Sequence, residues 1–230
     1  MQTLIKIGKL IFTAVLAVSV LPVLYAKQPA GPDLSDKYKA ALASSQKIAD
    51  KANRYKLIFV RGFLSDARDD YFGDQLKWAK ENSIDALRVN IESEDSPAQN
   101  AGIITEAIRQ SDKPVILITH SKGGLDSLEA FIKNPAIRSK VKGWLPLQGP
   151  FYGSPLADHF YERPVLHGSA SLMLSIFGGN MGSLSSLRVA IRTPYMKRNE
   201  AEIAATLAEV PTISVACWKD LRLNPLQPQQ

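Results

Sequence analysis

The stretch PVILITHSKGGLDSLEAF, residues 114–131, changes character at its centre. Apolar and β-branched residues lead into His120 and Ser121, two glycines follow, and the remainder has the apolar spacing of a helix. The spacing predicts a buried strand, a sharp turn at Ser121 and then a helix. A serine at such a joint is either the N-cap of the helix or a nucleophile held above a sheet.

The rest of the chain alternates between short apolar strands and helical patterns. Strands are predicted at 55–62, 85–91, 113–119, 141–149 and 211–217, and helices at 33–53, 72–83, 96–111, 122–134 and 199–210. Strands separated by helices of this kind pair in parallel through right-handed crossovers. Strands that are apolar throughout agree, because helices cover both faces of such a sheet. We therefore expect an α/β fold, with a mostly parallel sheet flanked by helices.

Residues 151–194 interrupt this alternation and are rich in Gly, Ser, Met and Leu. We interpret them as a lid-like insertion over the sheet. Within them, the apolar run at 172–177 lies between glycines. It is expected either to cover a site and open towards lipid, as lids do, or to form an ordinary core helix.

The N-terminus and the composition limit the classes of function that the sequence allows. Residues 1–26 have the basic start, apolar run and small final residue of a secretory signal peptide, which leaves 27–230 as the mature domain, periplasmic or secreted. The alternative is an uncleaved membrane anchor, although the apolar run is short for a full span. Cys217 is the only cysteine, so no internal disulfide forms. A net charge of +6 without basic clusters gives no case for nucleic-acid binding.

The joint at Ser121 has the spacing of a nucleophile elbow. In a parallel sheet, ligands bind outside the carboxyl ends of the strands. The pentapeptide THSKG, 119–123, fits small–x–Ser–x–Gly, with Thr119 where glycine is usual. Gly62, after the first core strand, allows a loop to approach closely, so the amides of Phe63 and Lys122 are the expected oxyanion donors.

Three stretches in this order resemble the α/β-hydrolase superfamily, and specifically its bacterial lipase- or esterase-like branch: RGF at 61–63, THSKGGLDSLEA at 119–130 and LQGPFYGSPLAD at 147–158. The resemblance covers residues 56–160 and continues loosely to Asp220. Arg61 stands where these proteins usually have histidine, and PFYGSPLAD departs from their PHxGSPxAD form. The resemblance implies the α/β-hydrolase fold and cleavage of acyl or lipid esters, without a cofactor.

The resemblance places the triad carboxylate at Asp220, after the strand predicted at 211–217. Asp126 and Asp158 are less favoured, and Asp158 is expected to close its own loop by hydrogen bonds. A histidine would follow the carboxylate in family order, and none follows Asp220. His120 is expected to be structural.

Three explanations for the base stay open: a chain that lacks the last strand and its histidine, an inactive relative, or a base displaced to His159 or His167. We favour the first. Lys122 as a serine–lysine base is not favoured.

The sequence therefore predicts an exported serine hydrolase that cleaves carboxylic esters through an acyl-enzyme. Its substrate would be a small-molecule or lipid ester, with contact to a lipid interface. The alternative is a catalytically inactive protein of the same fold that binds an apolar ligand, and an acyltransferase is a weaker third reading. The sequence has no cluster with metal-ligand spacing and no phosphate loop, so neither metal nor cofactor is expected.

Overall fold

A computed structural model describes residues 34–43, 49–63, 65, 70–92, 95–162 and 181–216. Several features predicted from the sequence lie outside these residues. They are the signal peptide at 1–26, the apolar run at 172–177, His167, Cys217 and Asp220.

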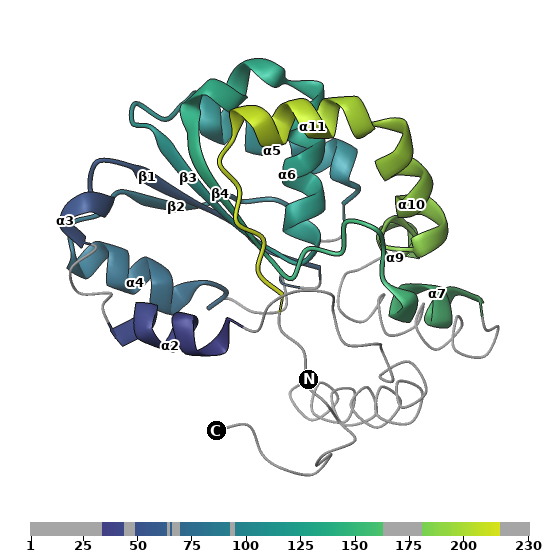
Figure 1. Cartoon of the computed structure of the whole chain (residues 1–230), viewed down its shortest axis with the longest axis horizontal. Coiled ribbons are helices and arrows are strands. Elements are labelled where there is room, and N and C mark those ends of the chain that lie inside the picture. Colours follow the sequence, from purple (N-terminus) through teal and green to yellow (C-terminus); the bar gives the residue numbers. More distant parts are fainter. Residues whose placement is uncertain are drawn as a thin grey trace, which may run out of the picture.

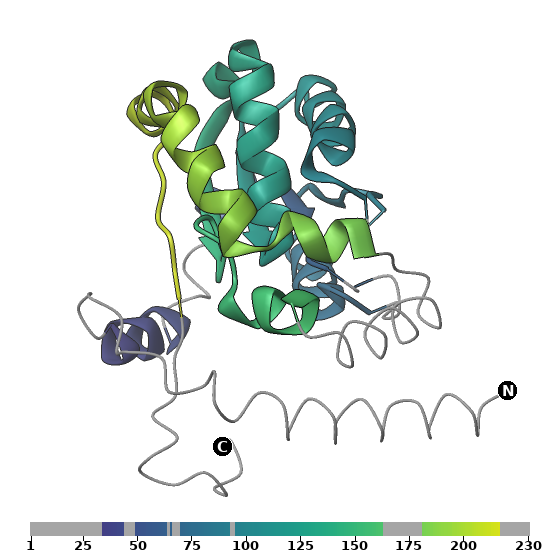
Figure 2. The ribbon, with the colours of Figure 1, turned by 90° about the vertical axis from the view of Figure 1, so that its right-hand side faces the viewer.

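The core of the fold is a parallel sheet. Its strands are β1 (Lys56–Val60), β2 (Ala86–Arg88), β3 (Val115–His120) and β4 (Val141–Leu147), in the spatial order β2-β1-β3-β4 (Figure 1). The last described segment runs along β4 (Figures 1 and 2), where Thr212 and Val215 form parallel bridges with Trp144 and Leu147. The predicted parallel sheet is confirmed, and the described residues of the strand predicted at 211–217 pair with β4 at two separate bridges.

Helices lie on both faces of this sheet. Their bounds are α2 (Ser35–Ala43), α3 (Ala49–Ala52), α4 (Gly73–Glu81), α5 (Pro97–Arg109), α6 (Lys122–Lys133), the 3-10 helix η3 (Pro135–Lys140), α7 (Pro155–Glu162), α9 (Met181–Ser186), α10 (Val189–Arg198) and α11 (Glu200–Glu209). Helices α5, α6 and α11 cover one face, and α4 covers the other (Figure 1). Helices α2 and α3 lie within the range predicted as one helix at 33–53, and residues 44–48 between them lie outside the described residues. None of the helices in the described ranges is long and apolar enough to cross a membrane.

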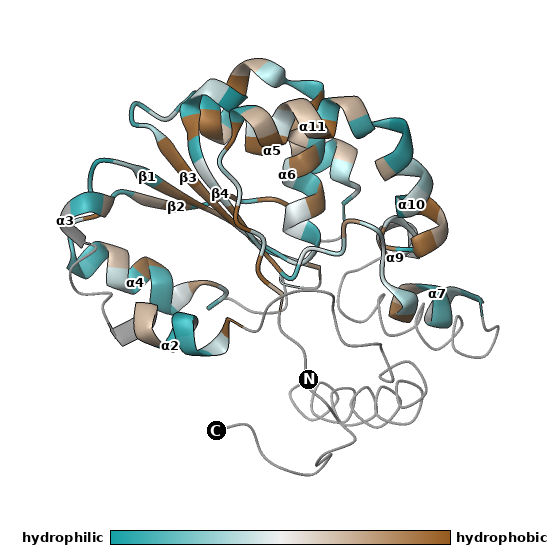
Figure 3. Ribbon diagram, viewed as in Figure 1, coloured by the Kyte–Doolittle hydropathy of each residue, from teal (hydrophilic) through white to brown (hydrophobic). Residues whose placement is uncertain are grey.

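The apolar core lies between the strands and helices α5 and α6. Strand residues such as Ile58 and Leu117 are fully buried, and so is Phe131 of α6. The strands of the sheet are largely hydrophobic (Figure 3). Along β3, buried residues alternate with half-buried ones. One face of the sheet is therefore sealed by helices more completely than the other. Helix α5 begins after Ser96, whose side chain accepts from the amide of Gln99, while the Gln99 side chain accepts from the amide of Ser96.

Described parts of the 151–194 segment are helical and pack beside the end of the sheet. Ala157 of α7, with Leu184 and Leu187, forms a cluster with Leu125 of α6. Asp158 accepts hydrogen bonds from Arg188 Nε and from the amide of Val189, both at 3.1 Å. Hydrogen bonding by Asp158 was expected, but it ties α7 to the start of α10 rather than closing its own loop.

The strand order has one reversal, between β1 and β3. The chain goes from β1 to β2 on one side and then crosses to β3 on the other side of β1. Connections that leave these two strands diverge, and this leaves a crevice at their carboxyl ends where such folds bind ligands. Ser121 directly follows β3, at this point of the sheet.

Candidate active site

Ser121 has a strained backbone at the joint between β3 and α6. Its φ of 52° and ψ of −123° lie in a region that residues other than glycine rarely adopt. Its amide donates to the Leu147 carbonyl at 2.9 Å, and its carbonyl accepts from the Gly124 amide at 3.0 Å. The Ser121 side chain makes no capping hydrogen bond to α6. Of the two sequence interpretations, the geometry therefore favours the nucleophile elbow over the N-cap.

Gly123 allows α6 to touch the end of β1. A Cβ at this position would lie 2.5 Å from the carbonyl oxygen of Arg61 and 2.6 Å from that of Val60. Both neighbours are backbone atoms, so only glycine fits without moving the helix or the strand. This contact is the physical reason for a glycine two residues after the serine.

The loop after β1 lies directly against the elbow. A Cβ on Gly62 would be 3.0 Å from Ser121 Cβ and 3.1 Å from the His120 carbonyl oxygen. Phe63, next in the chain, is half-buried and packs against the cluster that contains Leu125. The structure thus brings together the segments that carry the predicted nucleophile and both predicted oxyanion donors. The amide of Lys122 is in the first turn of α6, where backbone amides have no acceptor within the helix.

Thr119 has a structural reason to replace the usual glycine. It is fully buried, and its Oγ1 accepts a hydrogen bond from Trp144 Nε1 at 3.2 Å. A buried indole N–H without an acceptor would destabilise the core. The threonine hydroxyl therefore satisfies a donor on β4, which the sequence alone does not reveal because Trp144 is distant in the chain.

His120 hydrogen-bonds to Tyr71. Its Nδ1 shares a hydrogen bond with the Tyr71 hydroxyl, and the ring centroids are 5.9 Å apart. Burial lowers the pKa of His120 from its ordinary value. This pairing agrees with the structural role expected for His120. His159 is half-buried on α7.

Behind the elbow, Lys122 and Asp126 form a buried ion pair. The Lys122 ammonium lies 3.0 Å from each carboxylate oxygen of Asp126, and both side chains are fully buried. Burial raises the pKa of Asp126 to about 6, against the opposing attraction of Lys122. Because each side chain binds the other, neither Lys122 as base nor Asp126 as triad acid is supported.

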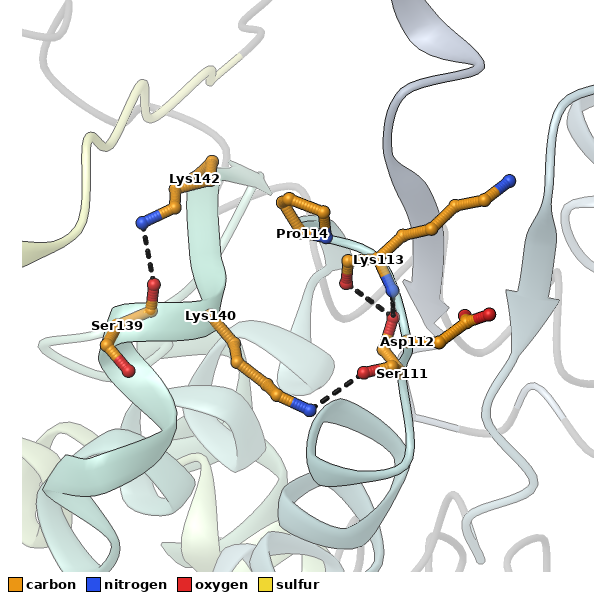
Figure 4. Close-up of a pocket in the computed structure, with 7 residues that line it drawn as sticks. All are labelled: Ser111, Asp112, Lys113, Pro114, Ser139, Lys140 and Lys142. Carbon is orange, nitrogen blue, oxygen red and sulfur yellow. Dashed lines mark hydrogen bonds between the residues drawn. The ribbon is translucent and has the colours of Figure 1, made fainter.

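A surface hollow of about 390 Å³ lies at the opposite end of the sheet (Figure 4). It is lined by Ser111, Asp112, Lys113, Pro114, Ser139, Lys140 and Lys142. The ammonium of Lys140 donates to the carbonyls of Arg109 and Ser111, and that of Lys142 donates to Ser139. The ammonium groups of these two lysines are therefore already hydrogen-bonded to backbone carbonyls. We place the candidate site at Ser121 and not in this hollow. In the described part of the chain, no group of three His, Cys, Asp or Glu side chains could hold a metal ion.

Comparison with known proteins identifies the fold. The structure is similar to the metagenomic carboxyl esterase MGS0156, with a TM-score of 0.60 and 23% identity, over 71% of this chain and 50% of that one. It is also similar to the mature form of the Bacillus licheniformis lipase BlEst2, with a TM-score of 0.57 and 22% identity, over 70% of this chain and 65% of that one. The chain therefore spans less than two thirds of the length of either protein.

No protein-family model and no curated protein matches the sequence. The likeness to solved structures is therefore the basis of the assignment. This likeness agrees with the three sequence motifs. The same fold is supported by the strand order, the parallel pairing and the strained backbone at Ser121. The chain has the α/β-hydrolase fold, which it shares with these carboxyl esterases and lipases.

Proposed function

We propose that this chain belongs to a serine hydrolase that cleaves carboxylic esters through an acyl-enzyme, with Ser121 as the nucleophile. The observation that carries the proposal is the backbone of Ser121, held at a φ of 52° where β3 meets α6, with no cap bond to explain it. Strain of this kind costs about 1–3 kcal/mol and persists at functional sites. The serine also lies at the crevice where the strand order reverses, which is where such sheets bind ligands.

In the proposed reaction, Ser121 Oγ loses its proton to a base and bonds to the ester carbonyl carbon. The carbonyl π electrons move to oxygen, and the amides of Phe63 and Lys122 donate hydrogen bonds to that oxyanion. Collapse of the intermediate breaks the bond to the alcohol, which leaves with a proton, and water then releases the acid from Ser121. Losing one oxyanion donor commonly costs about 10²–10³ in rate.

We propose Asp220 as the carboxylate that orients the base. The path of the preceding segment supports this role, because Val215 forms a parallel bridge with Leu147, and Leu147 pairs with His120. The segment therefore runs towards the end of the sheet that holds Ser121, and Asp220 follows Val215 by five residues. Asp220→Asn should lower turnover by orders of magnitude. Asp112→Asn, on the distant hollow, is the matched control and should leave turnover unchanged.

The general base can be sought by substitution of the histidines. His159→Ala and His167→Ala test a base from the 151–194 segment, measured as initial rates on p-nitrophenyl butyrate. Loss of activity in one variant identifies the base. If both variants retain full activity, the base does not come from that segment.

Covalent labelling tests the nucleophile directly. A fluorophosphonate probe should label the wild-type chain, and Ser121→Ala should abolish the labelling. The matched control is Ser127→Ala, a buried serine of the same helix whose hydroxyl has no hydrogen-bond partner within the described residues, and it should still label. Labelling that survives Ser121→Ala would refute the proposal.

The contact between His120 and Tyr71 favours one alternative, a protein of this fold that binds an apolar ester without turnover. His120 is the histidine next to the serine, and its Nδ1 is engaged with Tyr71. Equilibrium binding of a long-chain ester, with neither labelling nor product, would identify this alternative.

We also propose that the protein is exported and acts on small-molecule or lipid esters. The support is the signal-peptide pattern of residues 1–26 and the ester-hydrolase names of the similar structures. N-terminal sequencing of the protein from the cell exterior or periplasm should begin near Lys27. Retention of residues 1–26 on membranes would contradict export by cleavage.

A further inference from the structure

Two side-chain hydrogen bonds meet on one short segment after β2, Ile91–Glu92, which we name the anchor segment. The guanidinium of Arg61 donates to the carbonyl of Ile91. The side-chain amide of Asn100 donates to the carbonyl of Glu92 at 2.9 Å. Arg61 precedes the oxyanion loop, and Asn100 is on α5, so two different elements bind the same stretch of backbone.

From Asn100 the connection continues into the elbow helix. The same amide nitrogen also donates to Asp126 Oδ2 at 3.0 Å, so both of its hydrogens are used. Asp126 in turn binds the ammonium of Lys122. Asn100, Asp126 and Lys122 are each 0% exposed. We name these three residues the elbow network.

Burying the charges of the elbow network costs free energy of folding. Burial removes both charges from water, and replacing a buried ion pair by apolar side chains is often neutral or stabilising. The order of the pair is also unfavourable, since Lys122 lies at the positive end of α6 and precedes its acidic partner. Helix stability therefore does not explain the pair. Lys122 directly follows the proposed nucleophile Ser121, so a role in the site would explain its position.

We propose that the elbow network and Arg61 position the two oxyanion donors relative to each other. The network holds Lys122, whose own amide is one donor. Arg61 holds the loop that carries the other donor, the amide of Phe63. Both ends bind the anchor segment, which thus sets the spacing of the donors. This inference rests on the proposed function of Ser121, and these side chains are positioning residues because they act through the backbone amides.

The network is expected to respond to pH because its acceptor is a buried carboxylate. Lys122 of the same helix and Asn100 of α5 face Asp126, and the buried cation Arg192 of α10 also attracts its carboxylate. Burial raises the pKa of Asp126 to about 6. Protonation below this pH leaves the buried ammonium of Lys122 without its anionic partner. The donor amide on Lys122 then loses its fixed position as the pH falls.

The first experiment measures the rate of Ser121 phosphonylation by a fluorophosphonate from pH 5 to 9. The wild-type rate should show an inflection near pH 6, and Asp126→Asn should remove that inflection and slow labelling about tenfold at pH 8, a part of the loss expected for a whole oxyanion donor. An inflection from a catalytic histidine would remain in the variant. Asp112→Asn, an exposed aspartate outside the network, is the control and should keep the wild-type profile. Equal profiles for wild type and Asp126→Asn would overturn the proposal.

A double variant separates positioning from folding. Lys122→Met with Asp126→Leu replaces the ion pair by apolar side chains, a change that is often neutral or stabilising and that offsets the acceptor lost by Asn100. The variant should therefore fold, and its melting temperature checks this. Positioning predicts slower labelling in this folded variant by about tenfold, with the effect on kcat rather than on KM for p-nitrophenyl butyrate. Labelling at the wild-type rate would mean that the pair is merely structural.

A readout without catalysis distinguishes this proposal from the function it rests on. If the wild-type chain is not labelled at all, the proposed function fails. The coupling is then tested by the backbone amide resonances of Phe63 and Lys122. Coupling through the anchor segment predicts that Asp126→Asn shifts the resonance of Phe63 as well as that of Lys122. An unchanged Phe63 resonance would overturn the coupling.

Discussion

Gly123→Ala is the sharpest test of the elbow geometry. The added methyl would lie 2.5 Å from the carbonyl oxygen of Arg61 and 2.6 Å from that of Val60, at the end of β1, about 1 Å closer than ordinary contact distance. Neither oxygen can rotate away, so α6 or the end of β1 must move. Overpacking of this kind costs about 1–3 kcal/mol, and backbone contacts place it near the upper limit. The gain in helix propensity from alanine, up to about 1 kcal/mol, offsets only part of this cost.

Gly102→Ala is the matched control. Gly102 is an exposed helical glycine in α5, and a Cβ there would have no neighbour within 4 Å. Alanine should therefore stabilise the chain by about 0.5–1 kcal/mol. Urea unfolding followed by circular dichroism should separate the two variants by about 3 kcal/mol, or roughly 5–10 °C in Tm. If Gly123→Ala is as stable as Gly102→Ala, the close approach of α6 to β1 is wrong.

Three further changes probe the same region. Ser121→Gly should be about 1–2 kcal/mol more stable than Ser121→Ala in urea unfolding, because glycine adopts a φ of 52° without strain; equal stabilities would remove the argument from strain. Thr119→Val should lower the free energy of unfolding by about 2 kcal/mol by leaving the Trp144 indole N–H without its acceptor. Thr119→Ser keeps the hydroxyl, and a loss as large as that of valine would count against the bond. Asp126 has a folded pKa of about 6, above its unfolded value of 3.8, so the folded chain binds more protons between these values. The wild type should therefore lose stability as the pH rises from about 4 to 6, measured against Asp126→Asn by urea unfolding at each pH; a difference that does not vary with pH would contradict the raised pKa.

Much of the fold follows from local patterns in the sequence. The strand predicted at 113–119 and the helix predicted at 122–134 correspond to β3 and α6 with shifts of one or two residues. These boundaries are sharp because a buried apolar strand, a glycine pair and a helical apolar stripe follow one another directly. The start of the helix predicted at 96–111 is also local, because the Ser96 cap and its partner Gln99 are three residues apart.

Elements whose shape depends on distant contacts were harder to predict. The 151–194 segment was interpreted as an insertion, and α10 within it was not recognised. That helix contains Pro194 and buries the charged Arg192, so its sequence lacks the usual apolar stripe. The segment at 211–217 has the composition of a strand, yet its described residues, 211–216, pair with β4 through two separate bridges, at Thr212 and Val215. How far a strand pairs depends on its partner, which the local pattern does not contain.

The candidate site likewise has some features that follow from local sequence and others that depend on distant contacts. Ser121 could be located from the sequence because its neighbours must be small at fixed spacing, and that requirement is local. Lys122 and Asp126 are four residues apart on a helix, a spacing that usually marks an exposed pair. Here the pair is buried, because Asn100 of α5 donates a hydrogen bond to Asp126 and the surrounding helices exclude solvent from both side chains. A buried charge needs partners from several elements, so the buried pair behind Ser121 depends on the packing between helices, whereas the turn at Ser121 depends on a short run of residues.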